Sequence, residues 1–427
     1  MSVLTPERSR SRLLVTFIAT GLGFMLIPGT FLGVWNLVQI SGRESVSLVS
    51  PAWLQAHGHA QIFGWIGSFI LGIGFYSLPA SRQHASNGYR QAWIAWLLWT
   101  AGVAMRWATN VYGGPWRVSL PASALLELMA FLLLFSKVAR HRPEGEVRMQ
   151  PAVRIVICAT TGFALTLLFN LGACVYVAAT AQTAAFPHAL DQRYLTLATW
   201  GFLGPFIWGF SAKWLPVMLG LRTTRVRSLF GGVFVNALAV MLTLAGYGSL
   251  AAALLPFGVV LVIAGLRLFE PSEGAAKTRG VSESFPHFVR IAYVWLVVSS
   301  LLTVGATIWD VSGGIWGASR HAFTVGFVST MVFSIGQRVL PAFAGARVLW
   351  STRLMSAGLI CLNVGCFLRV ASEIPAYQHG AAWAWSVLPV SAVTELVAVT
   401  VFAVNLLGTL LSESHATAAP ALAGAPR

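Results

Sequence analysis

Charged residues are scarce in this chain. Asp, Glu, Lys and Arg together make up 10% of its 427 residues, whereas a soluble domain carries about 25%. Hydrophobic residues make up 56%, and the mean hydropathy is +0.73. This composition excludes a large soluble enzyme. It predicts a protein that crosses a membrane several times.

Cysteines are also few, and a signal-peptide cleavage site is missing. Cys158, Cys174, Cys361 and Cys366 lie inside apolar segments, and no two of them form a Cys-x-x-Cys pair. This pattern favours helix packing over a zinc or iron–sulfur site. The basic start of the chain leads into a long apolar run without an Ala-x-Ala-like cleavage site. We therefore expect an uncleaved first membrane span.

Twelve hydrophobic runs are about as long as a helix that crosses a bilayer, which needs about 20 residues. Helices are expected because each satisfies its own backbone hydrogen bonds in lipid. The predicted spans are 13–36, 57–79, 90–110, 120–139, 154–180, 193–217, 229–248, 250–268, 287–310, 320–341, 353–371 and 382–410.

Basic residues are distributed unevenly between the loops. If the N-terminus lies inside, all but six of the 28 Lys and Arg residues fall on the inner side. This asymmetry predicts that the N-terminus and the C-terminus both lie in the cytoplasm. It also accounts for the net charge of +15, so we expect the lipid bilayer, and no nucleic acid, as a partner. Segment 270–283 and tail 412–427 are predicted to be mobile.

An internal repeat organises the single membrane domain. In helices 2, 6 and 10, a glycine is followed fifteen residues later by the proline of a Leu-Pro pair. Three four-helix modules follow from this period, and they cover approximately residues 13–140, 154–268 and 287–410. The repeated pairs are Gly64 and Pro79, Gly201 and Pro216, and Gly326 and Pro341.

The outer two modules also repeat three polar residues. Each carries a histidine five residues before the glycine, an arginine on its third helix and a glutamate on its fourth. The middle module has Thr196 and Val262 at the histidine and glutamate positions, and no arginine at the third. Ionisable residues are costly inside a membrane, so their recurrence indicates function. The repeated residues are His59 and His321, Arg106 and Arg369, and Glu127 and Glu395.

Histidines from two facing helices are a common way to ligate haem iron in a bundle. At 1.5 Å per residue, His59 lies roughly 30 Å from Pro79, near the outer boundary, and His321 lies at the same depth. We expect this pair as the axial ligands. Arg106 and Arg369 would then suit the haem propionates. Glu127 and Glu395 could orient the histidines or relay protons, and Trp65 could pack on the macrocycle.

His57 has no counterpart in the third module, where Ser319 takes its place. It could ligate a second metal together with the outer-loop residues His188 or His379, and copper is plausible because imidazole suits it. An interfacial histidine facing headgroups is the alternative. On the same side, Asp310 could form an ion pair with Arg320.

Three motifs carry a resemblance to a known family. Residues 57–64, His-Gly-His-Ala-Gln-Ile-Phe-Gly, resemble the W-H-A-H-E-M-x-F-G-F opening of the NnrS family. Residues 320–326, Arg-His-Ala-Phe-Thr-Val-Gly, look like its H-A-L-T-V-G signature, and 200–222 fit its middle segment. Residues 57–65 are also similar to helix 2 of haem–copper oxidase subunit I and its nitric oxide reductase relatives.

The resemblance implies an all-α polytopic membrane protein with twelve transmembrane helices in three pseudo-repeated four-helix modules, like haem–copper oxidase subunit I. It implies b-type haem and copper, with His57, His59 and His321 as ligands, and a role in the response to nitric oxide. Two departures matter. Gln61 stands where the family commonly has Glu, and the absence of histidine from 193–248 argues against a complete binuclear centre.

Three functions are therefore considered. The first is a haem-binding protein that handles nitric oxide or its metal nitrosyl products. The second is a quinol-linked reductase of nitric oxide, which would make the chain an oxidoreductase. The third is a transporter of a small solute or metal, since internal repeats and buried charges are also typical of transporters. The residues do not identify a catalytic group or separate turnover from binding.

Overall fold

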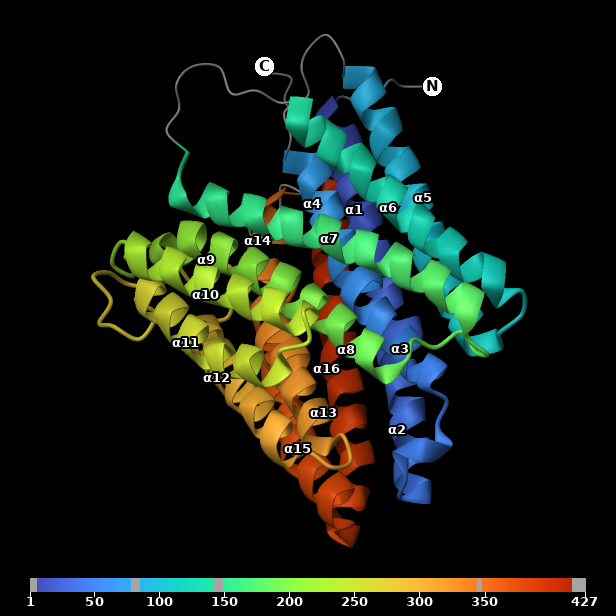
Figure 1. Cartoon of the computed structure of the whole chain (residues 1–427). Coiled ribbons are helices and arrows are strands. Elements are labelled where there is room, and N and C mark those ends of the chain that lie inside the picture. The colour runs from blue at the N-terminus through green and yellow to red at the C-terminus, as the bar shows by residue number, and fades with distance from the viewer. Residues whose placement is uncertain (1–5, 78–84, 141–148, 344–347, 417–427) are drawn as a thin grey trace, which may run out of the picture.

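The structure is a computed structural model that describes residues 6–77, 85–140, 149–343 and 348–416. Every regular element in these ranges is a helix (Figure 1). Eleven helices are long and apolar enough to cross a membrane. A twelfth, α5 (Ala85–Tyr112), is as long, but its tryptophans and two arginines lower its hydropathy. The prediction of twelve helices in a multi-pass membrane protein is confirmed.

The first module contains four long helical segments. The first segment is continuous from α1 through η1 to α2 and runs past the predicted end at residue 36. The second joins α3, η3 and α4, and Pro79 lies outside the described residues. The bounds are α1 (Pro6–Phe24), η1 (Met25–Phe31), α2 (Leu32–Arg43), η2 (Val46–Leu48) in the following loop, α3 (Pro51–His59), η3 (Ala60–Gly67), α4 (Ser68–Ser77), α5 (Ala85–Tyr112) and α6 (Trp116–Arg140).

The second and third modules repeat this order. The second consists of α7 (Pro151–Thr180), α8 (His188–Thr196), η4 (Leu197–Leu203), α9 (Gly204–Leu219), α10 (Val226–Leu244) and α11 (Gly248–Leu266). The third consists of α12 (Phe285–Trp309), α13 (Gly314–His321), η5 (Ala322–Ser329), η6 (Val332–Gly336), α14 (Gln337–Phe343), α15 (Thr352–His379) and α16 (Ala382–Ala416). Residues 412–416, predicted as part of the tail, continue α16, because nothing interrupts the helix there.

The helices pack as a closed ring of modules. Within each module the last two helices form an antiparallel pair: α5 with α6, α10 with α11, and α15 with α16. Between modules, α6 contacts α7, α11 contacts α12, and α16 returns to α2. In Figure 1 the red α16 accordingly lies between the blue first module and the orange α13 and α15. The repeated second helix of each module faces the middle of this ring.

A π-helical segment occurs at the same place in all three modules. Segments η3, η4 and η5 begin directly after His59, Thr196 and His321, the matched repeat positions. A π-helical turn leaves backbone carbonyls available to side chains of other helices. The Trp99 indole N–H on α5 donates to the Phe63 carbonyl at 3.1 Å. The matching donor in the second module is Asn236 on α10, whose amide donates to the Trp200 carbonyl at 2.7 Å. The repeat therefore extends to backbone hydrogen bonding.

Loop 270–283 lacks regular structure, but it is tied to the helices. The Glu273 and Lys277 backbone N–H groups donate to the Gly220 and Met218 carbonyls at 2.9 and 2.8 Å. The Glu270 carboxylate pairs with Arg225 and Arg267 at 2.9 and 2.7 Å. The hydrogen bond from Arg267 lowers the pKa of Glu270. The prediction of a mobile segment took no account of these contacts, and those with Met218, Gly220 and Arg225 come from residues distant in sequence.

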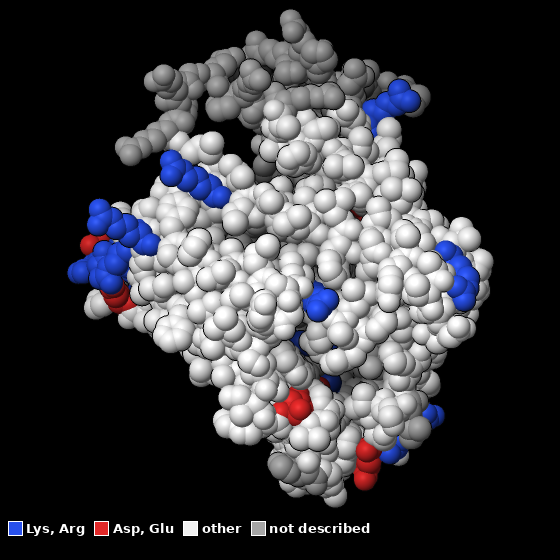
Figure 2. All heavy atoms as spheres, viewed as in Figure 1, with Lys and Arg blue, Asp and Glu red and all other residues white. Residues whose placement is uncertain are grey.

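Most of the molecular surface that is visible in Figure 2 is uncharged. Figure 2 shows a largely uncharged surface with basic and acidic side chains gathered at the left edge and toward the ends, and a few charged atoms recessed in a hollow. The left edge is where the yellow loop between α11 and α12 lies in Figure 1. This separation is what a lipid-facing belt requires, since charge in the hydrocarbon core is costly.

Candidate cofactor cavity

A cavity of about 1110 Å³ lies among the second helices of the three modules. Pockets for cofactors and small molecules have volumes of about 300–1,000 Å³, so this one can hold a large ligand. Apolar and aromatic side chains make up much of its wall, including Trp65, Trp200 and Phe323. The ionisable side chains on the wall are His57, His59, Arg106, His188, Asp191, Tyr194, Asp310, Arg320, His321, Arg369, Glu373, Tyr377 and Glu395.

His59, the last residue of α3, has partners for both ring nitrogens. Its Nε2 lies 2.8 Å from Glu127 Oε1 on α6, and its Nδ1 lies 3.2 Å from the Tyr194 hydroxyl on α8. The ring stacks on Phe63, with centroids 4.7 Å apart. Glu127 is fully buried. A ligand atom could reach a nitrogen of this ring only by breaking one of these hydrogen bonds.

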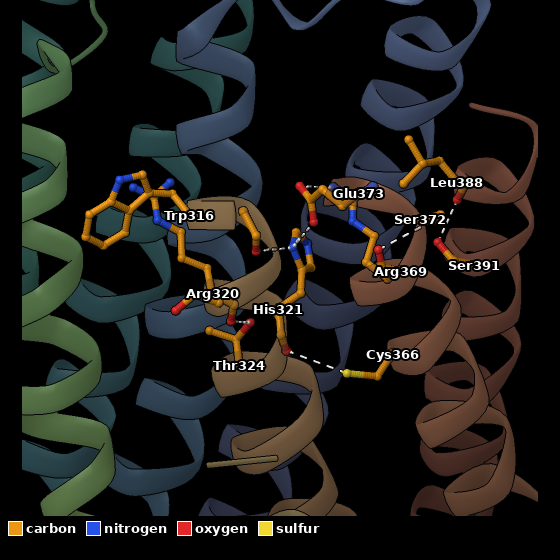
Figure 3. A network of polar contacts seen from close by, with 12 residues as sticks. Trp316, Arg320, His321, Thr324, Cys366, Arg369, Ser372, Glu373, Leu388 and Ser391 are labelled. Carbon is orange, nitrogen blue, oxygen red and sulfur yellow. Dashed lines mark hydrogen bonds and ion pairs between the residues drawn. The ribbon is translucent and has the colours of Figure 1, made fainter. Parts of the chain in front are cut away.

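His321, the last residue of α13, keeps one nitrogen free. Its Nδ1 lies 2.9 Å from the Gly317 carbonyl and 3.3 Å from Glu373 Oε2. Arg369 donates from Nη2 to Glu373 Oε1 at 3.2 Å, so arginine and glutamate form a pair beside the imidazole. Figure 3 shows His321 facing Arg369 and Glu373 on α15. In the part of the chain that is described, His321 Nε2 has no hydrogen-bond partner, and the residue lies on the cavity wall.

The two predicted glutamates are not equivalent in their contacts. Each packs against a glycine of the preceding helix, since a Cβ on Gly102 would lie 2.9 Å from Glu127 Cγ and one on Gly365 would lie 2.7 Å from Glu395 Cγ. Glu127 binds a histidine, whereas Glu395 Oε1 is buried without a hydrogen-bond partner. At His321 the carboxylate comes instead from Glu373. Sequence reasoning missed Glu373, although it follows Arg369 by four residues on one helix face.

Among the described residues, His57 forms a hydrogen bond through its Nδ1 atom only. Its Nδ1 lies 2.9 Å from the Gly29 carbonyl in η1. Gly33 on α2 makes room for the ring, because a Cβ there would lie 2.6 Å from His57 Cε1. His57 is close enough to His321 and Arg369 for their charges to interact. Its Nε2 has no hydrogen-bond partner among the described residues, and His57 lies on the cavity wall.

The predicted second metal set is only partly described. His188 is exposed near the Gln192 amide, with 3.4 Å between the nitrogens, and it lies on the cavity wall. The side chain of His379 lies outside the described residues. Across the described ranges, no three His, Cys, Asp or Glu side chains are grouped so that they could hold a metal ion.

The cavity arginines differ in their partners. Arg106 is 1% exposed; its Nη1 lies 2.7 Å from Cys174 Sγ, and its guanidinium lies 4.5 Å from the Phe186 ring centre. The predicted ion pair of Asp310 with Arg320 is wrong. Asp310 instead accepts from the Gly313 and Trp316 backbone N–H groups, each at 2.7 Å, and so caps the start of α13. Trp65, the predicted macrocycle contact, lies on the wall and packs edge-on against Phe333 and Phe402.

Two comparisons with known proteins give similarities. The family model described as NnrS protein matches residues 15–414. A solved structure described as "Cryo-EM structure of a heme-copper terminal oxidase dimer provides insights into its catalytic mechanism" is similar with a TM-score of 0.54 at 13% identity. The match covers 96% of this chain and 85% of that one. At this identity the likeness supports the fold alone. No curated protein matches.

Proposed function

Because this chain belongs to the NnrS family, we propose that it binds b-type haem in the cavity and takes part in the response to nitric oxide. The observation that carries this proposal is a cavity of about 1110 Å³ with two imidazoles that each keep a free Nε2, His57 and His321. Bound haem would supply one-electron chemistry and affinity for small ligands such as nitric oxide.

The residues fit a haem held by His57 and His321. Each ring is fixed through Nδ1 by a backbone carbonyl, at 2.9 Å in both cases, which is how ligand histidines are commonly oriented. Both residues lie on the cavity wall, and they belong to different modules. His59 fits less well, because both of its nitrogens already have partners. We therefore assign His57, in place of His59, as the partner of His321.

The surrounding residues set the orientation and polarity of the site. Glu373 Oε2 lies 3.3 Å from His321 Nδ1, and Arg369 pairs with the other oxygen of the same carboxylate, so a charged pair flanks the imidazole. The His59 and Glu127 pair, closed off by Tyr194, provides a buried polar wall that can hold a proton between the two side chains. The apolar remainder of the cavity, including Trp65 and Phe323, excludes water from the ligand.

Copper has less support than haem. The described residues contain no group of three His, Cys, Asp or Glu suited to a metal ion. Copper could bind only through fewer protein ligands, such as His57 or His188. No step of the proposed function depends on it.

Histidine variants test the assignment. Purified His57→Ala and His321→Ala should each lose haem, while His59→Ala should keep it. His287→Ala serves as a matched control, because His287 is an exposed histidine at the start of α12. Haem is measured by absorption, and folding is measured by thermal unfolding of each variant. Loss of haem in His59→Ala with retention in His57→Ala would refute the assignment in favour of His59.

A reductase is the second candidate, because the fold is shared with a haem–copper terminal oxidase. A reductase would consume nitric oxide steadily with a quinol as the electron donor. Measuring nitric oxide in proteoliposomes with and without quinol separates the two functions. Consumption in proportion to quinol would favour turnover, and stoichiometric binding without consumption would favour a binding or sensing role.

The proposed setting is the bacterial inner membrane, with both termini in the cytoplasm. The basis is the excess of Lys and Arg in the loops on the N-terminal side. Reporter fusions to the C-terminus would test the orientation. Activity of a reporter that works only in the periplasm would contradict it.

A further inference from the structure

One corner of the cavity wall carries more positive than negative charge. Arg106, Asp191 and Arg320 come from α5, α8 and α13 respectively. Asp191 interacts electrostatically with both arginines. Among the described residues, however, neither arginine has a carboxylate within 4 Å, in contrast to Arg369, which pairs with Glu373. One acidic group therefore faces two guanidinium groups without pairing with either.

Arg106 is the more deeply buried of the two. It is 1% exposed, and its Nε has no hydrogen-bond partner in the described part of the chain. Its recorded side-chain contacts are the Cys174 sulfur and the face of Phe186. Sulfur is a weak acceptor, so it does not replace an oxygen partner. A buried charge without a partner is strongly unfavourable, and Arg106 is one of the residues that line the cavity.

Arg320 likewise has a buried donor without a hydrogen-bond partner among the described residues. Its Nη2 is buried and has no hydrogen-bond partner within the described ranges, although the residue lies on the cavity wall. In Figure 3 the side chain of Arg320 leaves α13 on the opposite side from His321. Asp310, the nearby acid in sequence, is occupied in capping α13. Arg320 is therefore a cavity-wall arginine that adjoins the proposed iron ligand His321 in sequence, with its side chain leaving α13 on the other side.

We propose that Arg106 and Arg320 form a subsite for a carboxylate, and that its occupant is the propionate edge of the haem. The planar donor fork of arginine matches a carboxylate, and such charge-assisted bonds are stronger than neutral ones. This inference rests on the proposed haem function for the source of the carboxylate. It changes the anchor expected from the repeat, because the charge of Arg369 is paired with Glu373, although its Nε and Nη1 have no hydrogen-bond partner among the described residues.

In haem dimethyl ester, two neutral methyl esters replace the charged propionates of haem. Haem-free protein is titrated with both compounds. Wild type should bind haem about 10-fold to 100-fold more tightly than the ester, as expected for one charge-assisted hydrogen bond or more. In Arg106→Gln and Arg320→Gln this ratio should fall toward one. Arg117→Gln, which removes an exposed arginine bound to the Ala178 and Ala181 carbonyls, should leave it unchanged.

The experiment also separates a subsite from a merely structural role. Removing an unpaired buried charge should leave the haem-free variant at least as stable as wild type in thermal unfolding, whereas a structural role predicts lower stability. Arg106→Lys keeps the charge without the fork and should give an intermediate ratio. Equal affinity of wild type for haem and its ester would overturn the propionate assignment.

Free propionate ion distinguishes failure of the subsite from failure of the proposed function. If the protein binds no haem, the haem proposal fails, and the ion is then titrated while tryptophan fluorescence is measured. Saturable binding that is lost in Arg320→Gln would keep the carboxylate subsite with a free anion as its occupant. No binding of either the ion or haem would overturn the subsite as well.

Discussion

Replacing Gly33 by alanine tests whether His57 holds the cofactor. A Cβ at this position would lie 2.6 Å from His57 Cε1 and 2.8 Å from Nδ1. Carbon atoms in contact are normally about 3.5–4.0 Å apart, so the ring must move by roughly 1 Å. The 2.9 Å hydrogen bond from His57 Nδ1 to the Gly29 carbonyl then breaks. The imidazole loses the contact that orients it.

The expected loss of haem affinity is about 10-fold to 100-fold, the usual effect of removing a contact that orients a metal-ligating histidine. It is measured by titrating haem into haem-free protein while following the absorption spectrum. Gly42→Ala is the control on the same helix, because a Cβ there meets nothing within 4 Å. Unchanged affinity in both variants, with both folded, would refute the role of His57.

Three further changes probe the polar network and the inner loop. Glu127→Ala should lower the free energy of unfolding by about 3–5 kcal/mol, because it leaves His59 buried without its carboxylate partner. Glu127→Gln should lower the free energy of unfolding by less. Thermal or denaturant unfolding measures both variants. Glu373→Gln should weaken haem binding through His321. Glu395→Gln should have a smaller effect, because Glu395 forms no hydrogen bond or ion pair with a histidine among the described residues, and equal losses would contradict the geometry. Arg267 and Arg225 lower the pKa of Glu270, so the ion pairs of Glu270 stabilise loop 270–283 at neutral pH and are lost as pH falls through that lowered pKa. Limited proteolysis with an acid protease should therefore cut the loop only below the ordinary pKa of 4.5. Cleavage that is unchanged from pH 6 to pH 3 would contradict this.

The fold could be predicted because bilayer physics acts on long stretches of sequence. Twelve apolar runs and a repeated glycine and proline spacing are visible without any contact being known. The same reasoning could not give the ends of the helices. The segment predicted to end at residue 36 continues to Arg43, and the last helix continues to Ala416, because polar residues at a boundary can remain helical.

Many of the residues that line the cavity could be predicted from the sequence, but the contacts between them could be predicted only in part. The repeat placed His59 and His321 at equivalent positions, and η3 and η5 both begin directly after them. Hydrogen bonding does not follow the repeat. Glu127 reaches His59 from another helix, whereas Glu373 takes the corresponding place at His321. Which carboxylate contacts each histidine depends on which side chain of a neighbouring helix lies beside the imidazole ring.

Tyr194 and Gly33 show why the rest was hidden. Tyr194 belongs to the second module, which lacks the repeated histidine, and it still completes the surroundings of His59. Gly33 lies on the first helix and matters only because the ring of His57 occupies the space beside it. Neither residue has a sequence signal, since both act through packing between distant segments. The distinction between His57 and His59 likewise depends on which ring nitrogens are free.

The most direct test of the central claim is the absorption spectrum of the purified protein, oxidised and then reduced with dithionite, with haem quantified on the same sample. The account predicts b-type haem in stoichiometric amount, with sharp α and Soret bands on reduction. A folded, monodisperse preparation that contains no haem and takes up none when haem is added would contradict it.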